Sequence, residues 1–179
     1  MPELAQRREP LDGIPAIRHR SKLTIEAVAP RLRYSLRGSE AVAKAAGNAF
    51  GLELPLTINR ATVDGDRIAF RLGPDEWHLM GASVGPIATD EAFSLVEISH
   101  RNTAIAVSGS AATDVLAAHV MLDLDLAAFP VGMATRTLLT KAEILLFRDT
   151  ISSFQIEVWR SFAPYVFGLL SEAAREHLK

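Results

Sequence analysis

Short runs of alternating or mostly apolar residues predict β-strands along most of this chain. We expect strands at residues 23–28, 32–37, 57–63, 67–72, 76–80, 95–99, 103–108, 134–140, 143–148 and 154–160. Turn-forming residues such as Asp64-Gly65 and Gly73-Pro74-Asp75 separate neighbouring runs, as they do in β-hairpins.

Apolar residues spaced three and four apart predict three helices. The first, residues 41–50, buries one face made of Val42, Ala45, Ala46, Ala49 and Phe50. Ser39 is its expected N-cap, because a serine oxygen accepts a hydrogen bond from a first-turn N–H. Gly51 is the expected stop. The second helix follows Ser110 as a cap and buries Ala112, Val115, Leu116, His119 and Val120; the last covers residues 162–177.

The same order of elements occurs twice, which indicates an internal duplication. Gly38 and Gly109 each end a strand and begin a helix, and they lie 71 residues apart. We therefore predict an α+β fold of internally duplicated strand–helix–strand units, with antiparallel sheet and helices packed on it. Residues 22–179 are expected to form one compact region of two pseudo-repeated halves, 22–90 and 91–179. Residues 1–21, rich in proline and arginine, are expected to form an extended N-terminal arm, either disordered or ordered by a partner.

Composition narrows the classes of protein to which this chain can belong. The 179 residues are 49% hydrophobic, carry a net charge of −2 and include no cysteine. The charge balance disfavours a nucleic-acid partner. The absence of cysteine removes disulfides, thiolate metal sites and cysteine nucleophiles. No apolar run reaches the roughly 20 residues that cross a bilayer, and the N-terminus lacks the apolar core of a signal peptide. We expect a cytoplasmic protein.

A search for catalytic and cofactor motifs gives a negative result. Gly38 and Gly109 stand alone, without the glycine-rich spacing that cradles phosphates. No two histidines share a metal-binding spacing, and the serines lack the nucleophile-elbow pattern. Asp123 and Asp125 could share one side of an extended segment and serve acid–base work or bind a cation, but a solvated surface is the favoured interpretation. We expect no catalytic, cofactor-binding or metal site in this chain.

Arginine and aromatic side chains gather at predicted strand ends and on the last helix, a composition typical of protein–protein contacts. The candidates for such contacts are Arg71, Trp77, His78, His100, Arg101, Arg136, Arg160, Phe162 and Tyr165. Trp77 and Trp159 lie within strands and are expected more often as core residues. Phe162, Tyr165 and Phe167 surround the start of a helix, so they cannot all point into one core.

Several runs in order resemble one known family. They are Arg71-Leu-Gly-Pro-Asp-Glu-Trp77, Val96-Glu-Ile-Ser-His-Arg101, Ala106-Val-Ser-Gly-Ser110, Phe129-Pro130, Arg136-Thr-Leu138, Lys141-Ala-Glu143 and Arg160-Ser-Phe-Ala-Pro-Tyr165. From Leu23 to the C-terminus the chain resembles the gamma subunit of heterotetrameric sarcosine oxidase. The resemblance implies a fold like the folate domain of aminomethyltransferases. It also implies an enzyme complex that demethylates sarcosine to glycine, forming hydrogen peroxide and, with tetrahydrofolate, methylenetetrahydrofolate.

Within that family the cofactors belong to other chains. The resemblance implies FAD, FMN, NAD and tetrahydrofolate in the alpha and beta subunits and zinc in the delta subunit. This chain would then be a non-catalytic subunit that supports assembly with alpha, beta and delta, with self-association possible when it is isolated. The alternative is a stand-alone folate or one-carbon-binding protein, in which Arg101 or Arg136 binds the glutamate tail of the pterin. The chain is about half as long as a full aminomethyltransferase, and it lacks the cysteine motif of related tRNA-modifying proteins, which weighs against this alternative.

Overall fold

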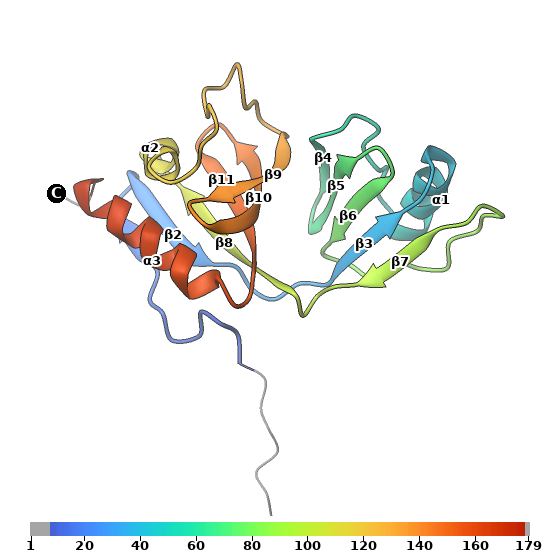
Figure 1. Ribbon diagram of the computed structural model, residues 1–179, viewed down its shortest axis with the longest axis horizontal. Helices are drawn as coiled ribbons and strands as arrows, with labels where there is room; N and C mark the ends of the chain where they lie inside the picture. Colours follow the sequence, from blue (N-terminus) through green and yellow to red (C-terminus); the bar gives the residue numbers. More distant parts are fainter. Residues whose placement is uncertain (1–7, 178–179) are drawn as a thin grey trace, which may run out of the picture.

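The predicted strands and helices build two lobes side by side, each an antiparallel sheet with helix on its outer face (Figure 1). The computed structural model describes residues 8–177. Sheet A has the order β1 (Ile17–His19), β2 (Leu23–Ala27), β8 (Asn102–Ser108), β11 (Ser153–Trp159), β10 (Ala142–Thr150), β9 (Ala134–Leu139). Sheet B has the order β4 (Arg60–Asp64), β5 (Arg67–Gly73), β6 (Glu76–Met80), β3 (Arg33–Arg37), β7 (Ser94–Glu97). The helices are α1 (Glu40–Phe50), α2 (Ala112–Ala117) and α3 (Ala163–Ala174), which a 3₁₀ turn, η1 (Arg175–His177), extends. The α+β class predicted from the sequence is confirmed.

The two lobes do not divide the chain at residue 90, because the halves exchange their first strands. β2, from the first half, pairs with β8 in sheet A, and β7, from the second half, pairs with β3 in sheet B. With this exchange the two sheets have the same order, β9-β10-β11-β8-β2 matching β4-β5-β6-β3-β7. The duplication read from the sequence is therefore real in the structure, but its units interlock.

The N-terminal segment is packed onto sheet A along part of its length. Leu11 is 3% exposed within the core of that lobe. β1 adds an antiparallel edge strand to β2, with Ile17 opposite Ile25. The expected arm over residues 1–21 is thus corrected from residue 11 onward, since burial and strand pairing hold this part in place; residues 1–7 lie outside the described range.

The helix ends follow the sequence signals in one copy and depart from them in the other. The Val42 N–H donates to Ser39 Oγ at 3.2 Å, and Gly51 ends α1 with φ of +73°. At α2 the N-cap position is Ala111, and no side chain caps the helix. The prediction of Ser110 as a cap is wrong because the turn after Gly109 continues for one more residue before the helix begins.

Three apolar clusters hold the layers together. One packs the outer face of sheet A against α2 and α3, and a second packs the outer face of sheet B against α1. The third lies between the sheets, where the ring centroids of Phe70 and Phe147 are 5.2 Å apart in an edge-on arrangement. Backbone bonds join the lobes at the same end: the Ala61 N–H donates to the Gly132 carbonyl and the Ala134 N–H to that of Asn59. Within residues 8–177 no helix is both long and apolar enough to cross a membrane.

Candidate functional site

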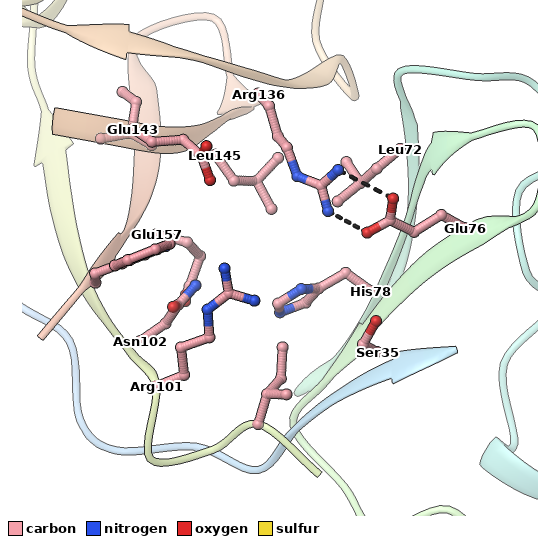
Figure 2. Close-up of a pocket in the computed structure, with 13 residues that line it drawn as sticks. Ser35, Leu72, Glu76, His78, Arg101, Asn102, Arg136, Glu143, Leu145 and Glu157 are labelled. Atoms are coloured by element: carbon pink, nitrogen blue, oxygen red, sulfur yellow. Dashed lines mark hydrogen bonds and ion pairs between the residues drawn. The ribbon is translucent and has the colours of Figure 1, made fainter. Parts of the chain in front are cut away.

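The inner faces of the two sheets become polar beyond the third cluster and enclose a small cavity there (Figure 2). Strand alternation places this polarity, because residues two apart share a face. The cavity has a volume of about 50 Å³ and is lined by Ser35, Leu72, Glu76, His78, Ile98, Arg101, Asn102, Arg136, Glu143, Ile144, Leu145, Glu157 and Trp159. Both lobes contribute, so the cavity exists only when the sheets face each other.

A buried ion pair crosses between the lobes at one side of this cavity. Arg33 of β3 donates from Nε to Glu157 Oε2 at 2.6 Å and from Nη2 to Oε1 at 3.1 Å. Their side chains are 2% and 1% exposed. Arg33 also donates to the Arg31 carbonyl, and Gln155 donates to Glu157. Burial raises the pKa of the Glu157 carboxyl above its ordinary value, although the Arg33 guanidinium pulls it the other way.

A second pair crosses in the opposite direction. Arg136 of β9 donates through Nη1 to Glu76 Oε2 at 3.0 Å, and its Nη2 contacts Glu76 Oε1, as the dashed lines in Figure 2 mark. Arg37 adds a third contact to the same carboxylate at 2.9 Å. The hydrogen bond from Arg136 holds the pKa of Glu76 below its ordinary value. The two pairs fix how the sheets face each other, because each joins a residue of one lobe to a residue of the other.

His78 lies between these pairs without a hydrogen-bond partner for Nε2 in the described structure. It is 6% exposed, and its ring points into the cavity (Figure 2). Burial, with a further contribution from the nearby cations Arg33 and Arg136, lowers the pKa of His78 to about 3. The imidazole is therefore neutral at ordinary pH.

The remaining polar residues line the side of the cavity formed by sheet A. Arg101 lies over the ring of Trp159, 4.8 Å from its centroid. Asn102 Oδ1 is buried and unpartnered in the described structure. Glu143 is exposed at the rim. With its charged groups largely paired to one another, the cavity is a junction between lobes more than an open reaction site.

Two candidates for a partner contact, Arg71 and Trp77, are core residues here, as the sequence already favoured for Trp77. Trp77 is fully buried, and its Nε1 donates to the Pro55 carbonyl at 2.8 Å. Arg71, 6% exposed, lies over that ring and donates to Glu40 Oε1 at 2.7 Å and to the Pro74 carbonyl at 2.7 Å. These side chains fasten the loop after α1 to sheet B. Neither they nor His78 offer surface to a partner.

The other candidates lie at or near the surface. His100, Arg101 and Arg136 are exposed. Phe162 and Tyr165 are 39% and 40% exposed, whereas Phe167 is 5% exposed, so the start of α3 does divide its aromatic residues between surface and core. Trp159, expected as a core residue, is 40% exposed. Arg160 holds the N-terminal segment, with Nη1 on Glu9 and Nη2 on the Arg8 carbonyl.

Sequence reasoning did not single out the residues that form the junction itself. Arg33, Glu76 and Glu157 were treated as ordinary strand residues. A signal was present for Glu157, which lies between the apolar residues Ile156 and Val158 in the run Phe154-Gln-Ile-Glu-Val158. A charge in such a position requires a partner, but the sequence does not say which strand supplies it.

The cavity does not fit a pterin or a flavin. Ligand pockets usually measure about 300–1,000 Å³, so about 50 Å³ suffices for a few water molecules. A wider hollow of about 660 Å³ lies beside α1, but its charged residues, Glu40, Lys44 and Glu53, are all exposed.

Among residues 8–177 no three acidic or histidine side chains are grouped so as to hold a metal ion. Asp123 and Asp125 cap their own loop, each accepting a backbone N–H two residues on.

Comparison with known proteins shows the family to which this chain belongs. The model of the sarcosine oxidase, gamma subunit family matches residues 37–176. The chain belongs to the sarcosine oxidase gamma subunit family. The resemblance noted in the sequence is thereby confirmed. No curated protein matches the sequence.

Solved structures show where this family's fold recurs. The heterotetrameric sarcosine oxidase from Corynebacterium sp. U-96, in complex with pyrrole 2-carboxylate, includes a chain with a TM-score of 0.85 and 24% identity, and the match covers 97% of each chain. The glycine cleavage system aminomethyltransferase T from Bartonella henselae has a TM-score of 0.61 and 13% identity, over 84% of this chain and 46% of that one. The gamma subunit fold is therefore similar to about half of an aminomethyltransferase.

Proposed function

We propose that this chain is a non-catalytic gamma subunit, which supports assembly of a cytoplasmic sarcosine oxidase with alpha, beta and delta subunits. In this proposal FAD, FMN, NAD, tetrahydrofolate and zinc are bound by those partners. The assembled enzyme demethylates sarcosine to glycine and forms hydrogen peroxide and methylenetetrahydrofolate. This chain contributes surface and rigidity.

The state of the central cavity is the observation that carries the proposal. The place where facing sheets could hold a ligand is small, and the carboxylates Glu76 and Glu157 are tied to arginines of the opposite lobe. A reacting group must have freedom to exchange a proton or meet a substrate. Glu76 and Glu157 instead accept hydrogen bonds from arginines that join the two lobes. Exposed arginine and aromatic side chains elsewhere are available for contacts with partner subunits.

The proposal is tested by leaving the chain out. All four subunits are co-expressed with a tag on the alpha subunit, with and without the gamma gene, and the purified material is assayed for sarcosine-dependent hydrogen peroxide. We expect the chain to co-purify with alpha. We expect the complex without it to be less stable to heat, and the isolated chain to be colourless and inactive. An isolated chain that oxidises sarcosine, or one that never co-purifies, contradicts the proposal.

Tyr165 tests whether the start of α3 contributes to this assembly. Removal of a large exposed aromatic ring from an interface commonly costs about 2 kcal/mol, close to a thirtyfold loss of affinity. We expect Tyr165→Ala to lower affinity for the tagged partners by about that factor, measured by titrating the purified gamma chain into the complex that lacks it. Met121→Ala is the matched control, because Met121 is 94% exposed and lies in the loop after α2, not on α3. Equal affinities for both variants would show that Tyr165 does not contribute to the interface.

The folate-binding alternative has less support. Arg136, one of the two arginines it would use, is committed to Glu76, and the cavity beside it does not fit a pterin. Calorimetric titration of the isolated chain with tetrahydrofolate separates the two functions. Micromolar binding without partner subunits would favour the alternative.

A further inference from the structure

Sheet A has one strand more than sheet B: β1 lies on the outer side of β2, whereas no described strand lies on the outer side of the equivalent strand β7. β2 and β7 occupy equivalent places next to β8 and β3. β1 pairs with the outer edge of β2. In the described part of the chain, no strand pairs with the outer edge of β7, which ends sheet B. In Figure 1, β7 accordingly lies at the lower margin of its lobe.

The registers show that the equivalence extends to single residues. Ile25 of β2 pairs with Val107 of β8, and Leu95 of β7 pairs with Leu36 of β3. Val107 and Leu36 lie at the same distance before Gly109 and Gly38, the glycines of the duplicated unit. Leu95 is therefore the counterpart of Ile25, the residue that lies opposite Ile17 of β1.

The open edge presents backbone groups to its surroundings. The Ile98 N–H donates to the Arg33 carbonyl at 2.8 Å. Because N–H and C=O groups alternate sides along an antiparallel strand, Val96 also faces β3, whereas Leu95 and Glu97 direct their N–H and C=O groups outward. An edge of this kind is a template for another strand unless it is protected.

Apolar side chains along this edge strand are partly exposed to solvent. Phe93 and Val96 are 42% and 52% exposed. Leu95 is half-buried, whereas its counterpart Ile25 is fully buried once β1 covers that edge. Exposed acidic residues, Glu91 and Glu97, stand before and at the end of the strand. The missing strand would therefore carry apolar side chains at its centre and basic ones beside them.

We propose that the free edge of β7 receives an extended segment of a partner subunit, which completes sheet B as its sixth strand in the way that β1 completes sheet A. The segment runs antiparallel to β7, hydrogen-bonds to Leu95 and Glu97, covers Phe93 and Leu95, and places Lys or Arg near Glu97. This mode of recognition is β-strand addition. It rests on the proposed function, because it takes the partner to be a subunit of the same complex.

Proline at position 97 tests the hydrogen bonds directly. Proline removes an N–H that points outward from an edge strand, and edge strands tolerate it there. We expect the isolated Glu97→Pro chain to melt within about 2 °C of wild type. Its affinity for the complex lacking gamma is expected to fall at least about tenfold. Glu97→Ala, which keeps the N–H, separates loss of the donor from loss of the carboxylate and is expected to bind within about threefold of wild type.

Hydrogen exchange supplies a second readout. We expect the Leu95 and Glu97 amides to exchange rapidly in the isolated chain and slowly in the assembled complex. Normal assembly of Glu97→Pro, with both amides still exchanging rapidly, overturns the inference and leaves the proposed function intact. A dimer of the isolated chain that Glu97→Pro abolishes also overturns it, because the occupant is then a second copy. Failure of the wild-type chain to assemble at all counts against the proposed function itself.

Discussion

Single residues in the cavity between the sheets carry charges that a protein interior ordinarily excludes. Arg33 and Glu157 share two hydrogen bonds away from water, and His78 lies close by as a neutral ring. A buried charged group is stable only where a partner offsets the free-energy cost of removing it from water. Substitution of each of these residues should therefore change the free energy of unfolding measurably.

His78 makes the folded state sensitive to mild acid. Its pKa is about 3 in the folded chain and about 6.5 when unfolded, so between these values the unfolded chain binds the extra proton and stability falls as pH falls. We expect a loss of about 2 kcal/mol from His78 alone between pH 7 and pH 5. Urea unfolding of wild type and His78→Gln at both pH values measures it. An identical loss in the variant, which cannot titrate there, would contradict this assignment.

Glu157→Gln tests the buried ion pair. The substitution leaves Arg33 charged and without its counter-ion, and breaking a buried pair costs about 3–5 kcal/mol. Urea unfolding at pH 7 measures the cost. Glu143→Gln is the matched control, since Glu143 faces the same cavity but is exposed, and we expect less than about 0.5 kcal/mol. A double variant, Arg33→Met with Glu157→Leu, should recover most of the loss; if it is no more stable than Glu157→Gln, the uncompensated charge is not the cause.

The sequence revealed part of this chemistry. It singled out His78 and Arg136, which both line the cavity. It named Arg71 and Trp77 as candidates for an outer contact while favouring the core for Trp77, because aromatic and arginine residues form both cores and interfaces. The partners of Arg33 and Glu76 were beyond sequence reasoning, since they lie on the opposite sheet and depend on how two sheets face each other.

At the scale of elements, local signals predicted the strands closely. β6 begins and ends where its alternation does, and α1 differs by one residue at its start. β1, with three residues, has too short a pattern to identify. The pairing of the strands was not predictable. An alternating pattern shows which side chains of a strand face the core, but it does not show which strand lies beside it.

The two serines after the repeated glycines make a direct test of element-level reasoning. Ser39 accepts the Val42 N–H, so Ser39→Ala should cost about 1 kcal/mol of stability. Ser110→Ala should cost less than about 0.5 kcal/mol, because α2 has no side-chain cap. Thermal or urea unfolding of both variants measures the difference. Equal costs would mean that the equivalence of the two copies extends to their caps after all.

The whole molecule is held as one unit by the exchange of β2 and β7. Each lobe contains a strand from the other half, and two ion pairs and a shared apolar cluster join the sheets. Elements that share this many contacts usually open together. We therefore expect the two sheets to unfold together.

Cooperative unfolding is the expected outcome at this scale. Ile156→Ala in sheet A removes a fully buried side chain and should cost about 3 kcal/mol. Hydrogen exchange should show β6 amides in sheet B losing the same protection as β11 amides. A fragment of residues 1–90 should remain unfolded alone, because β2 then has no sheet to join. Two calorimetric transitions, or a folded fragment, would contradict the interlocked description.

The exchanged strand also sets a delay during synthesis on the ribosome. β2, with Leu23 and Ile25 destined for complete burial, emerges early, but its neighbour β8 begins only at Asn102. At about 5–20 residues per second, a gap of roughly 75 residues lasts about 4–15 seconds. Throughout that interval the nascent chain has only β1 to pair with this apolar strand, which makes it a natural client for a chaperone that binds extended segments.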